Sequence, residues 1–267
     1  MHAKFKFILL FVVLSTTTHL YSFGCCAYNP HPISIYPFKD TICTKSIFIL
    51  SININDFNFL DSLKNIEFIA TNSTGKTTSL KIEKLYTGIG YQIILRPTKK
   101  LSKNDIISIK LISTNLKNID TSAFAEINEI IQNKKWIVGY NKAERVPQWS
   151  EKDSLTYRID DHRASSAPGY GVEISIPLIY NSKNRTNQFP IEIKYNGVHL
   201  IAYLQNGKLS LYNSICGANF FCEVGKVHNL KIRIFNSSGS YFTKIKEVSF
   251  FAKSINDGSA IILEDRH

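Results

Sequence analysis

The chain has 267 residues, of which 44% are hydrophobic and 12% aromatic, and its formal net charge is +11 at pH 7. This length suits two folded domains of about 110 residues each, a size that buries enough surface to be stable without many cross-links. The basic residues are scattered and no nucleic-acid-binding motif accompanies them, so we expect no nucleic-acid partner. The charge fits a soluble surface, and a general attraction to acidic cell-surface polymers is the alternative.

The first 24 residues have the pattern of an export signal. Lys4 and Lys6 precede an apolar run at 7–14, and the small residues Ser22 and Gly24 lie just before a cut after position 24. The apolar run is too short to cross a bilayer, which takes about 20 apolar residues. We therefore expect a signal peptide at 1–24 and a mature protein outside the cytoplasm, secreted or anchored at the cell surface, where disulfides persist.

The cysteine count is odd, which in an exported protein needs an explanation. One economical scheme pairs Cys26 with Cys43 and Cys216 with Cys222, and leaves Cys25 as the new N-terminus. Neighbouring cysteines can also exchange partners, so other pairings stay open.

A cysteine at the mature N-terminus is where bacterial lipoproteins carry their acyl chains. Gly24 fits the position before such a cysteine, whereas Ser22 and Phe23 depart from the usual pattern. Lipidation of Cys25 and a plain soluble protein are thus the two alternatives, and a lipid anchor is the only membrane contact that we expect.

Short segments rich in β-branched and aromatic residues, separated by turn formers, follow the signal. In the first of them Phe48, Leu50, Ile52 and Ile54 alternate with other residues and share one face of a strand. This spacing predicts an antiparallel sandwich over residues 25–140. The predicted strands are 47–54, 66–70, 80–86, 89–95 and 106–112.

One turn in this region carries a resemblance. A strand ends at Pro97, Leu101 follows, and Asn104-Asp105 opens the next strand; Pro37 precedes this region and Trp136 closes it. Over residues of about 33–140 this resembles the Ig-like domains of bacterial surface-layer and other secreted proteins. The resemblance implies an Ig-like sandwich. The chain departs from the pattern of this family within 116–132, where apolar residues have helical spacing. These residues are Ala123, Phe124, Ile127, Ile130 and Ile131.

The second half contains two Asn-Gly pairs that predict tight hairpins. Asn196-Gly197 and Asn206-Gly207 separate three strand-like segments, and Asn-Gly suits the positive φ angles of a type I′ turn. We expect a three-stranded meander within a second sandwich at 141–256. A tail at 257–267 follows, with one extra strand at 260–263.

Candidate site residues are few. Asp160, Asp161 and His162 form the densest polar cluster, which would be a divalent-cation site or a solvated loop between two strands. Asn72, Asn184 and Asn236 begin Asn-x-Ser/Thr triplets, which are glycan acceptors if the protein is eukaryotic.

Aromatic residues offer two further surfaces. The loop between Cys216 and Cys222 would expose Phe220 and Phe221 for binding, or a disulfide would close the loop with both phenylalanines packed below it. A sugar platform would use aromatic side chains that otherwise belong to the core. Its candidates are Trp136, Trp149, Tyr170, Tyr203 and Tyr212.

These observations predict an all-β protein of two consecutive Ig-like antiparallel sandwiches after a signal peptide. No catalytic motif is present, so we expect a non-enzymatic structural, adhesive or ligand-binding role without a cofactor. The partner would be an extracellular protein or polysaccharide. A carbohydrate-binding accessory module that uses an aromatic face of the second domain is the alternative. An enzyme would need a pocket at the domain junction, expected near 140–149.

Overall fold

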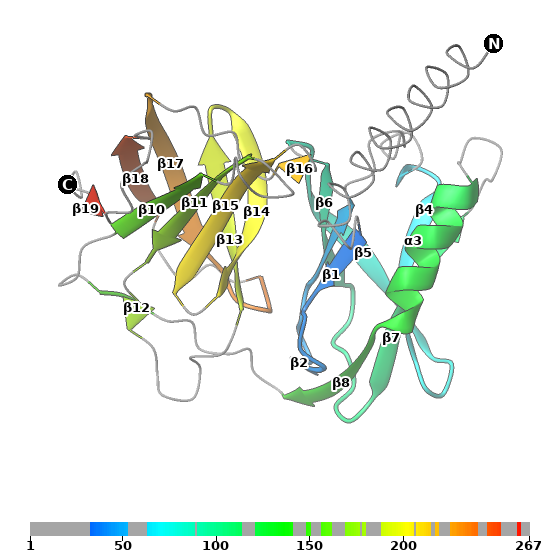
Figure 1. Cartoon of the computed structure of the whole chain (residues 1–267). Helices are drawn as coiled ribbons and strands as arrows, with labels where there is room; N and C mark the ends of the chain where they lie inside the picture. Colours follow the sequence, from blue (N-terminus) through cyan, green and yellow to red (C-terminus); the bar gives the residue numbers. More distant parts are fainter. Residues whose placement is uncertain are drawn as a thin grey trace, which may run out of the picture.

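The computed structural model is built mainly of β-strands, which confirms the all-β prediction (Figure 1). Two sheets form two lobes that lie side by side. The residues that the structure describes are 33–52, 63–88, 90–113, 121–140, 148–150, 156–161, 169–176, 178–179, 188–205, 207–214, 217–218, 225–239, 245–251 and 261–262. The predicted signal peptide, and with it Cys25 and Cys26, lies outside these residues.

The first domain is one eight-stranded sheet with a helix, in the strand order β1-β3-β6-β5-β4-β7-β8-β2. The predicted strands of this half are found within one to a few residues of their expected bounds. The elements are β1 (Ile33–Tyr36), β2 (Thr41–Cys43), β3 (Phe48–Ile52), β4 (Ile66–Asn72), β5 (Thr77–Tyr86), β6 (Tyr91–Pro97), β7 (Ile106–Ser113), α3 (Thr121–Asn133) and β8 (Lys135–Tyr140).

Strand β5 curls this sheet around its core. Residues 77–80 pair with β4 and residues 80–86 pair with β6, so β5 turns the corner between two halves of the sheet. A bulge near Glu83 shifts the register, and Tyr86 then lies against a different cluster from Leu80.

The predicted helical spacing is confirmed by α3. This helix packs against β7 and β1, on the side of the domain away from the second lobe (Figure 1). Its Ile127 and Ile131 are fully buried in the first core beside Trp136. The indole Nε1 of Trp136 donates a hydrogen bond of 2.8 Å to the carbonyl of Pro37. The last strand of the domain is thereby tied to its first segment.

The second domain is an antiparallel sheet in the order β18-β17-β13-β14-β15-β11-β10-β19, with β16 beside β15. Its core comes from alternate positions of β13, β14 and β17 above all. The elements are β10 (Thr156–Asp161), β11 (Gly169–Ser175), β13 (Phe189–Tyr195), β14 (Val198–Gln205), β15 (Lys208–Ser214), β16 (Gly217–Ala218), β17 (Val227–Ile234), β18 (Lys246–Phe251) and β19 (Ile261–Ile262), with a separate pair β9 (Gln148–Trp149) and β12 (Leu178–Ile179).

The Asn-Gly hairpins are confirmed. Asn196 and Gly197 have φ angles of 47° and 80°, and Tyr195 pairs directly with Val198 across the two-residue turn. Strands β13, β14 and β15 form the predicted meander. The extra strand expected in the tail is present as β19, which pairs with β10.

Two Asn-Ser-Ser/Thr-Gly turns have the same geometry. In each, the side-chain oxygen of Asn72 or Asn236 accepts from the amide and the hydroxyl two residues later. The following Gly75 and Gly239 have φ angles of 83° and 74° and donate their amides to the asparagine carbonyl. These sequences are therefore accounted for as turns. No helix among the described residues is long and apolar enough to cross a membrane.

Candidate functional site

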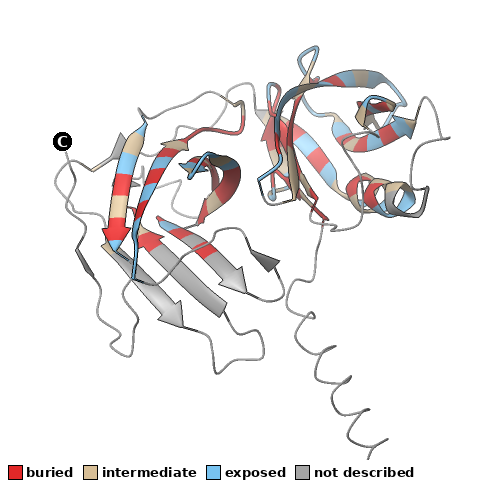
Figure 2. Cartoon of the chain, turned by 90° about the horizontal axis from the view of Figure 1, so that it is seen from above, coloured by how far each residue is buried: buried red, intermediate tan, exposed pale blue. Residues whose placement is uncertain are grey.

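Both domains contribute side chains to a third apolar cluster, which we call the domain junction. Side chains alternate between faces of a strand, so Phe48 and Leu50 point into the first core while Ile49 points to the junction. The strands there carry buried residues on both faces (Figure 2). The junction comprises Tyr36, Ile47, Ile49, Tyr86 and Ile94 of the first domain and Ile201, Phe235 and the partly buried Tyr203 of the second.

Hydrogen bonds also cross the junction. The Gln92 side chain accepts from the Ile201 amide at 2.6 Å and donates to the Ile201 carbonyl at 2.8 Å. The Ile47 amide donates to the Ser237 carbonyl at 2.7 Å. Backbone groups at a sheet edge need such partners once they are buried, so these contacts fix how the two domains meet.

Arg96 adds a charged contact between the domains. It holds Glu83 through two hydrogen bonds, of 2.9 and 3.2 Å, and its Nη1 donates to the Ser238 carbonyl of the second domain at 2.8 Å. A Cβ on the neighbouring Gly239 would lie 2.5 Å from Nη2 of Arg96 and 3.2 Å from Ile47. The turn at Gly239 thus approaches the first domain so closely that a side chain there would require Arg96 to shift.

A depression at the junction has a volume of about 610 Å³, and Lys84, Tyr86, Glu192 and His199 are among the residues that line it. Glu192, whose side chain is 16% exposed, accepts from the Tyr86 hydroxyl at 2.6 Å and pairs with Lys84 at 3.0 Å. The rings of Tyr86 and His199 stack with their centroids 6.4 Å apart. These polar groups bind one another across the junction, an arrangement that serves the contact between domains.

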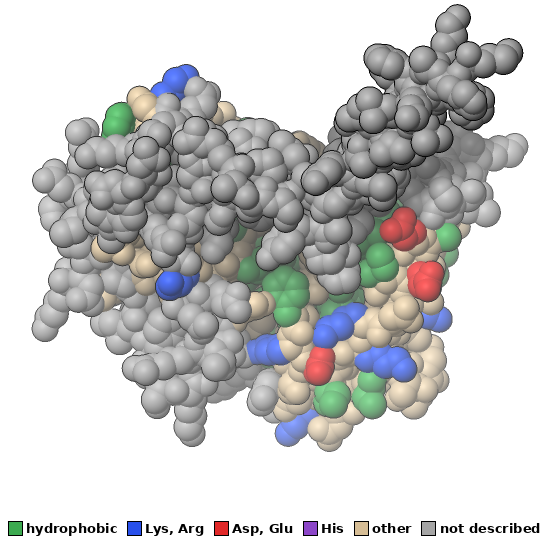
Figure 3. Space-filling view, viewed as in Figure 1, with side chains coloured by type: hydrophobic (Ala, Val, Ile, Leu, Met, Phe, Trp, Pro, Cys, Tyr) green, Lys and Arg blue, Asp and Glu red, His purple; other side chains and the backbone are tan. Residues whose placement is uncertain are grey.

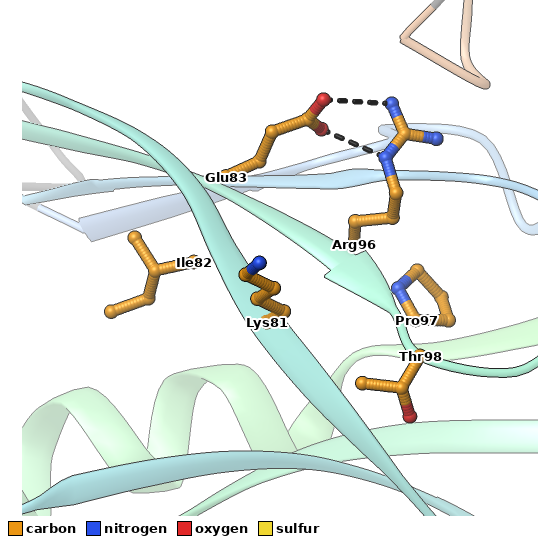
Figure 4. Close-up of a pocket in the computed structure, with 6 residues that line it drawn as sticks. All are labelled: Lys81, Ile82, Glu83, Arg96, Pro97 and Thr98. Atoms are coloured by element: carbon orange, nitrogen blue, oxygen red, sulfur yellow. Dashed lines mark hydrogen bonds and ion pairs between the residues drawn. The ribbon is translucent and has the colours of Figure 1, made fainter.

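A second region joins two shallow depressions of about 460 and 210 Å³ that share Arg96, Pro97 and Thr98. Lys81 borders the larger one, beside the Arg96–Glu83 pair (Figure 4). The smaller one is bordered by Lys45, Lys99 and Lys100. On the face of the first domain that Figure 3 shows, basic side chains are interspersed with acidic and apolar ones.

Buried tyrosines at the junction have shifted pKa values. Tyr36 stacks on Tyr203 with ring centroids 5.5 Å apart. Burial raises the pKa of both phenols well above the usual value near 10, and for Tyr36 the neighbouring Tyr203 adds to the effect. Burial also lowers the pKa of Lys39. In all three cases the pKa shift has the same main cause, because burial penalises the charged form of the group.

The cysteine expected to pair with Cys26 has a free thiol. Cys43 is buried at the end of β2, and its Sγ accepts a hydrogen bond of 3.3 Å from the Ser46 hydroxyl. The structure therefore has a thiol where a Cys26–Cys43 disulfide was expected. Cys26, Cys216 and Cys222 lie outside the described residues, and of the loop between the last two only β16 is described.

The predicted metal cluster is not assembled by the part of the chain that the structure describes. Asp160 and Asp161 belong to β10, in register with Gly171 and Tyr170, where a loop was expected. The polar connection is therefore shorter than predicted, and His162 lies outside the described residues. No group of three or more metal-binding side chains occurs among the described residues.

Two of the predicted glycan acceptors are engaged in turns. Asn236 is 3% exposed at the junction, a position without room for a glycan in the folded protein. The amide nitrogen of Asn72 donates to Asp105 at 2.9 Å. Asn184 lies outside the described residues.

The aromatic residues of the predicted sugar platform do not form one surface. Trp136 is fully buried in the first core, and Tyr203 packs into the junction. Tyr170 and Tyr212 lie on neighbouring strands β11 and β15, and Trp149 is in β9. The enzyme pocket expected near 140–149 falls mostly on residues 141–147, which lie outside the described residues. The described junction is built from β1, β3, β5, β6, β13, β14 and the residues at the end of β17.

The contact between the two domains is not among the features predicted from the sequence. A signal was present, because residues 47–50 and 200–204 are unbroken apolar runs, the pattern of strands buried on both faces. Period-two alternation in the first run assigns only one of its two faces to a core.

Comparisons with known proteins identify no family. No known family matches the chain, and no curated protein matches it. Similar solved structures are pullulanase type I from Bacillus subtilis in complex with maltose, at 10% identity and a TM-score of 0.21, and pullulanase from an Anoxybacillus species, at 5% identity and a TM-score of 0.22. The similar regions cover 81% of this chain but 24% and 25% of those chains. Similarity at this level carries no argument about function.

Proposed function

We propose that this chain is an exported, non-enzymatic protein of two Ig-like sandwiches with a structural, adhesive or ligand-binding role at a cell surface. The observation that carries the proposal is the domain junction. It combines a shared apolar cluster with hydrogen bonds between the domains, so the two domains present their surfaces as one rigid unit.

The Ig-like assignment of the first domain is supported by its strand order. An Ig constant-type sandwich places four strands in one layer and three in the other. Strands β1-β3-β6-β5 correspond to the four-stranded layer and β4-β7-β8 to the three-stranded layer. Strand β2 runs parallel to β8, an addition at the edge, and α3 stands between the last two strands.

The second domain has a related arrangement. Strands β10-β11-β15 correspond to one layer and β14-β13-β17-β18 to the other. Strands β14 and β15 pair only next to their turn, at Leu204–Leu209 and Gln205–Lys208. This short contact suits the corner at which a chain passes from one layer of a sandwich to the other. Seven strands in two layers is also the architecture of the fibronectin type III sandwich.

A binding role fits the way in which the polar groups are used. Glu192, Tyr86 and Lys84 converge at the junction, and they bind one another. A rigid pair of sandwiches leaves its loops and outer surfaces for partners. The proposed location outside the cytoplasm depends on the N-terminal pattern of Lys4, Lys6 and the apolar run after them.

Export can be tested on the full chain expressed with its own N-terminus in a secreting host. The mature protein should be found outside the cytoplasm, and its intact mass should correspond to a chain that begins at Cys25, with or without acyl groups. Recovery of the uncut chain from the cytoplasm would contradict the proposal. An acyl mass on Cys25 would identify the anchor, and its absence would indicate a freely secreted protein.

A further inference from the structure

We infer that the first domain binds a linear anionic polysaccharide along a basic groove, which we define as the two adjoining depressions and the residues Lys45, Lys81, Arg96, Lys99 and Lys100 that line them. This inference rests on the proposed extracytoplasmic role and names the class of ligand for it. The groove residues come from three separate segments of the chain, which the fold brings together around Pro97 and Thr98.

The sheet places like charges side by side in this groove. Lys81 of β5 lies directly opposite Arg96 of β6 in the register. Like charges at directly opposed positions of an antiparallel pair destabilise a sheet. Glu83 offsets the charge of Arg96, to which it is hydrogen-bonded, and leaves the Lys81 amine as an uncompensated positive charge. An anionic ligand would remove this repulsion.

The loop that carries Lys99 and Lys100 is held in place at both ends. The amide and hydroxyl of Thr98 donate to the Ser79 carbonyl at 2.9 and 3.0 Å. The Leu101 amide donates to the Thr44 carbonyl at 2.9 Å, next to Lys45. The backbone beneath the lysines is therefore fixed before a ligand arrives, which reduces the entropy lost on binding.

The amines of the groove are available to a ligand. Lys45, Lys81, Lys99 and Lys100 are exposed, and none of them has an ion pair with another side chain in the described part of the chain. Surface charges of this kind attract an oppositely charged polymer over roughly 10 Å at moderate salt. The mature chain that would begin at Cys25 keeps a positive net charge after the loss of Lys4 and Lys6, and this strengthens the attraction.

The lining favours a polysaccharide over a nucleic acid. No aromatic side chain lines either depression among the described residues. Proteins that bind single-stranded nucleic acid combine a basic channel with aromatic platforms on which bases stack. Besides the apolar side chains of Ile82 and Pro97, the groove offers charged groups, hydroxyls and backbone groups, which suit the sulfate and carboxylate groups of an acidic glycan.

The test uses the full mature protein and three probes: heparin as a sulfated polysaccharide, dextran as a neutral one and a single-stranded DNA of equal charge. One variant carries K45Q, K81Q, K99Q and K100Q together. The matched control carries K64Q, K110Q, K135Q and K194Q, four exposed lysines that line neither depression. Both variants have the same net charge, and circular dichroism checks that both are folded.

We expect heparin to bind at low salt and dextran not to bind. For a flexible polyanion each contact contributes roughly 0.7 to the slope of log affinity against log salt, so the groove variant should lower that slope by about 3, and the control variant by much less. Equal losses in the two variants would mean attraction by net charge alone and would overturn the inference. DNA binding as tight as heparin binding, or no binding of heparin, would overturn it as well. Export is measured separately, so either proposal can fail without the other.

Discussion

The approach of the two domains at Gly239 can be tested with a single methyl group. Gly239 and Gly75 occupy the same position in two turns of the same geometry, with φ angles of 74° and 83°. An alanine costs about 1–2 kcal/mol in this left-handed conformation at either site. Nothing lies within 4 Å of a Cβ at Gly75, so Gly75→Ala measures that backbone cost alone.

Gly239→Ala should cost more, because its Cβ would lie 2.5 Å from Nη2 of Arg96 and 3.2 Å from Cγ2 of Ile47. Arg96 cannot move away without weakening its bonds to Glu83 and Ser238. Overpacking of this kind typically costs about 1–3 kcal/mol. We therefore expect Gly239→Ala to destabilise the protein by roughly 1–3 kcal/mol more than Gly75→Ala does.

The assay is equilibrium unfolding in urea of the wild type and both variants. Fluorescence of Trp136, which is buried in the first core, is followed together with far-ultraviolet circular dichroism of the whole chain. If Gly239→Ala loses no more stability than Gly75→Ala, the two domains do not meet as described and the reasoning fails.

Two further perturbations address the junction. Gln92→Ala leaves the amide and carbonyl of Ile201 without partners and should lower the free energy of unfolding by about 2–4 kcal/mol, while Gln132→Ala on α3 should change it by no more than about 0.5 kcal/mol. Similar midpoints in urea for both variants would count against the junction bonds. Alkaline pH should also weaken the fold: the pKa values of Tyr36 and Tyr203 are raised, so above pH 10 the unfolded state releases protons that the folded state keeps. The contribution of the two tyrosines to stability is then constant below about pH 10 and falls above it by up to about 1.4 kcal/mol per pH unit for each tyrosine. Replacing Tyr203 by Phe should flatten that fall in a pH series of unfolding curves, and an unchanged slope would contradict the assignment.

Local rules predicted most of the elements. The Asn196-Gly197 hairpin follows from backbone preferences of two adjacent residues, and α3 follows from apolar spacing that ends at Ile131. Alternation at 48–52 predicted β3 and its core face. Each of these features depends on residues close together in the sequence, so it can be recognised without the fold.

The junction and the groove depend on contacts between distant segments. Gln92 meets Ile201 109 residues away, and no local pattern marks a glutamine for that role. The bulge in β5 that turns Tyr86 toward the junction breaks the period-two alternation on which the strand prediction relied. Lys81 and Arg96 become neighbours only when β5 and β6 pair. Basic residues that are scattered in the sequence are therefore brought together in the groove only by the fold.

The rigid coupling of the two domains is the claim on which the proposed function depends. Differential scanning calorimetry of the full mature chain tests it most directly, because two coupled domains unfold together whereas independent domains unfold separately. We predict one transition whose calorimetric and van't Hoff enthalpies agree, with a midpoint lowered by Gly239→Ala. Two separate transitions in the wild-type protein, both insensitive to Gly239→Ala, would show that the domains fold and move independently and would contradict the account.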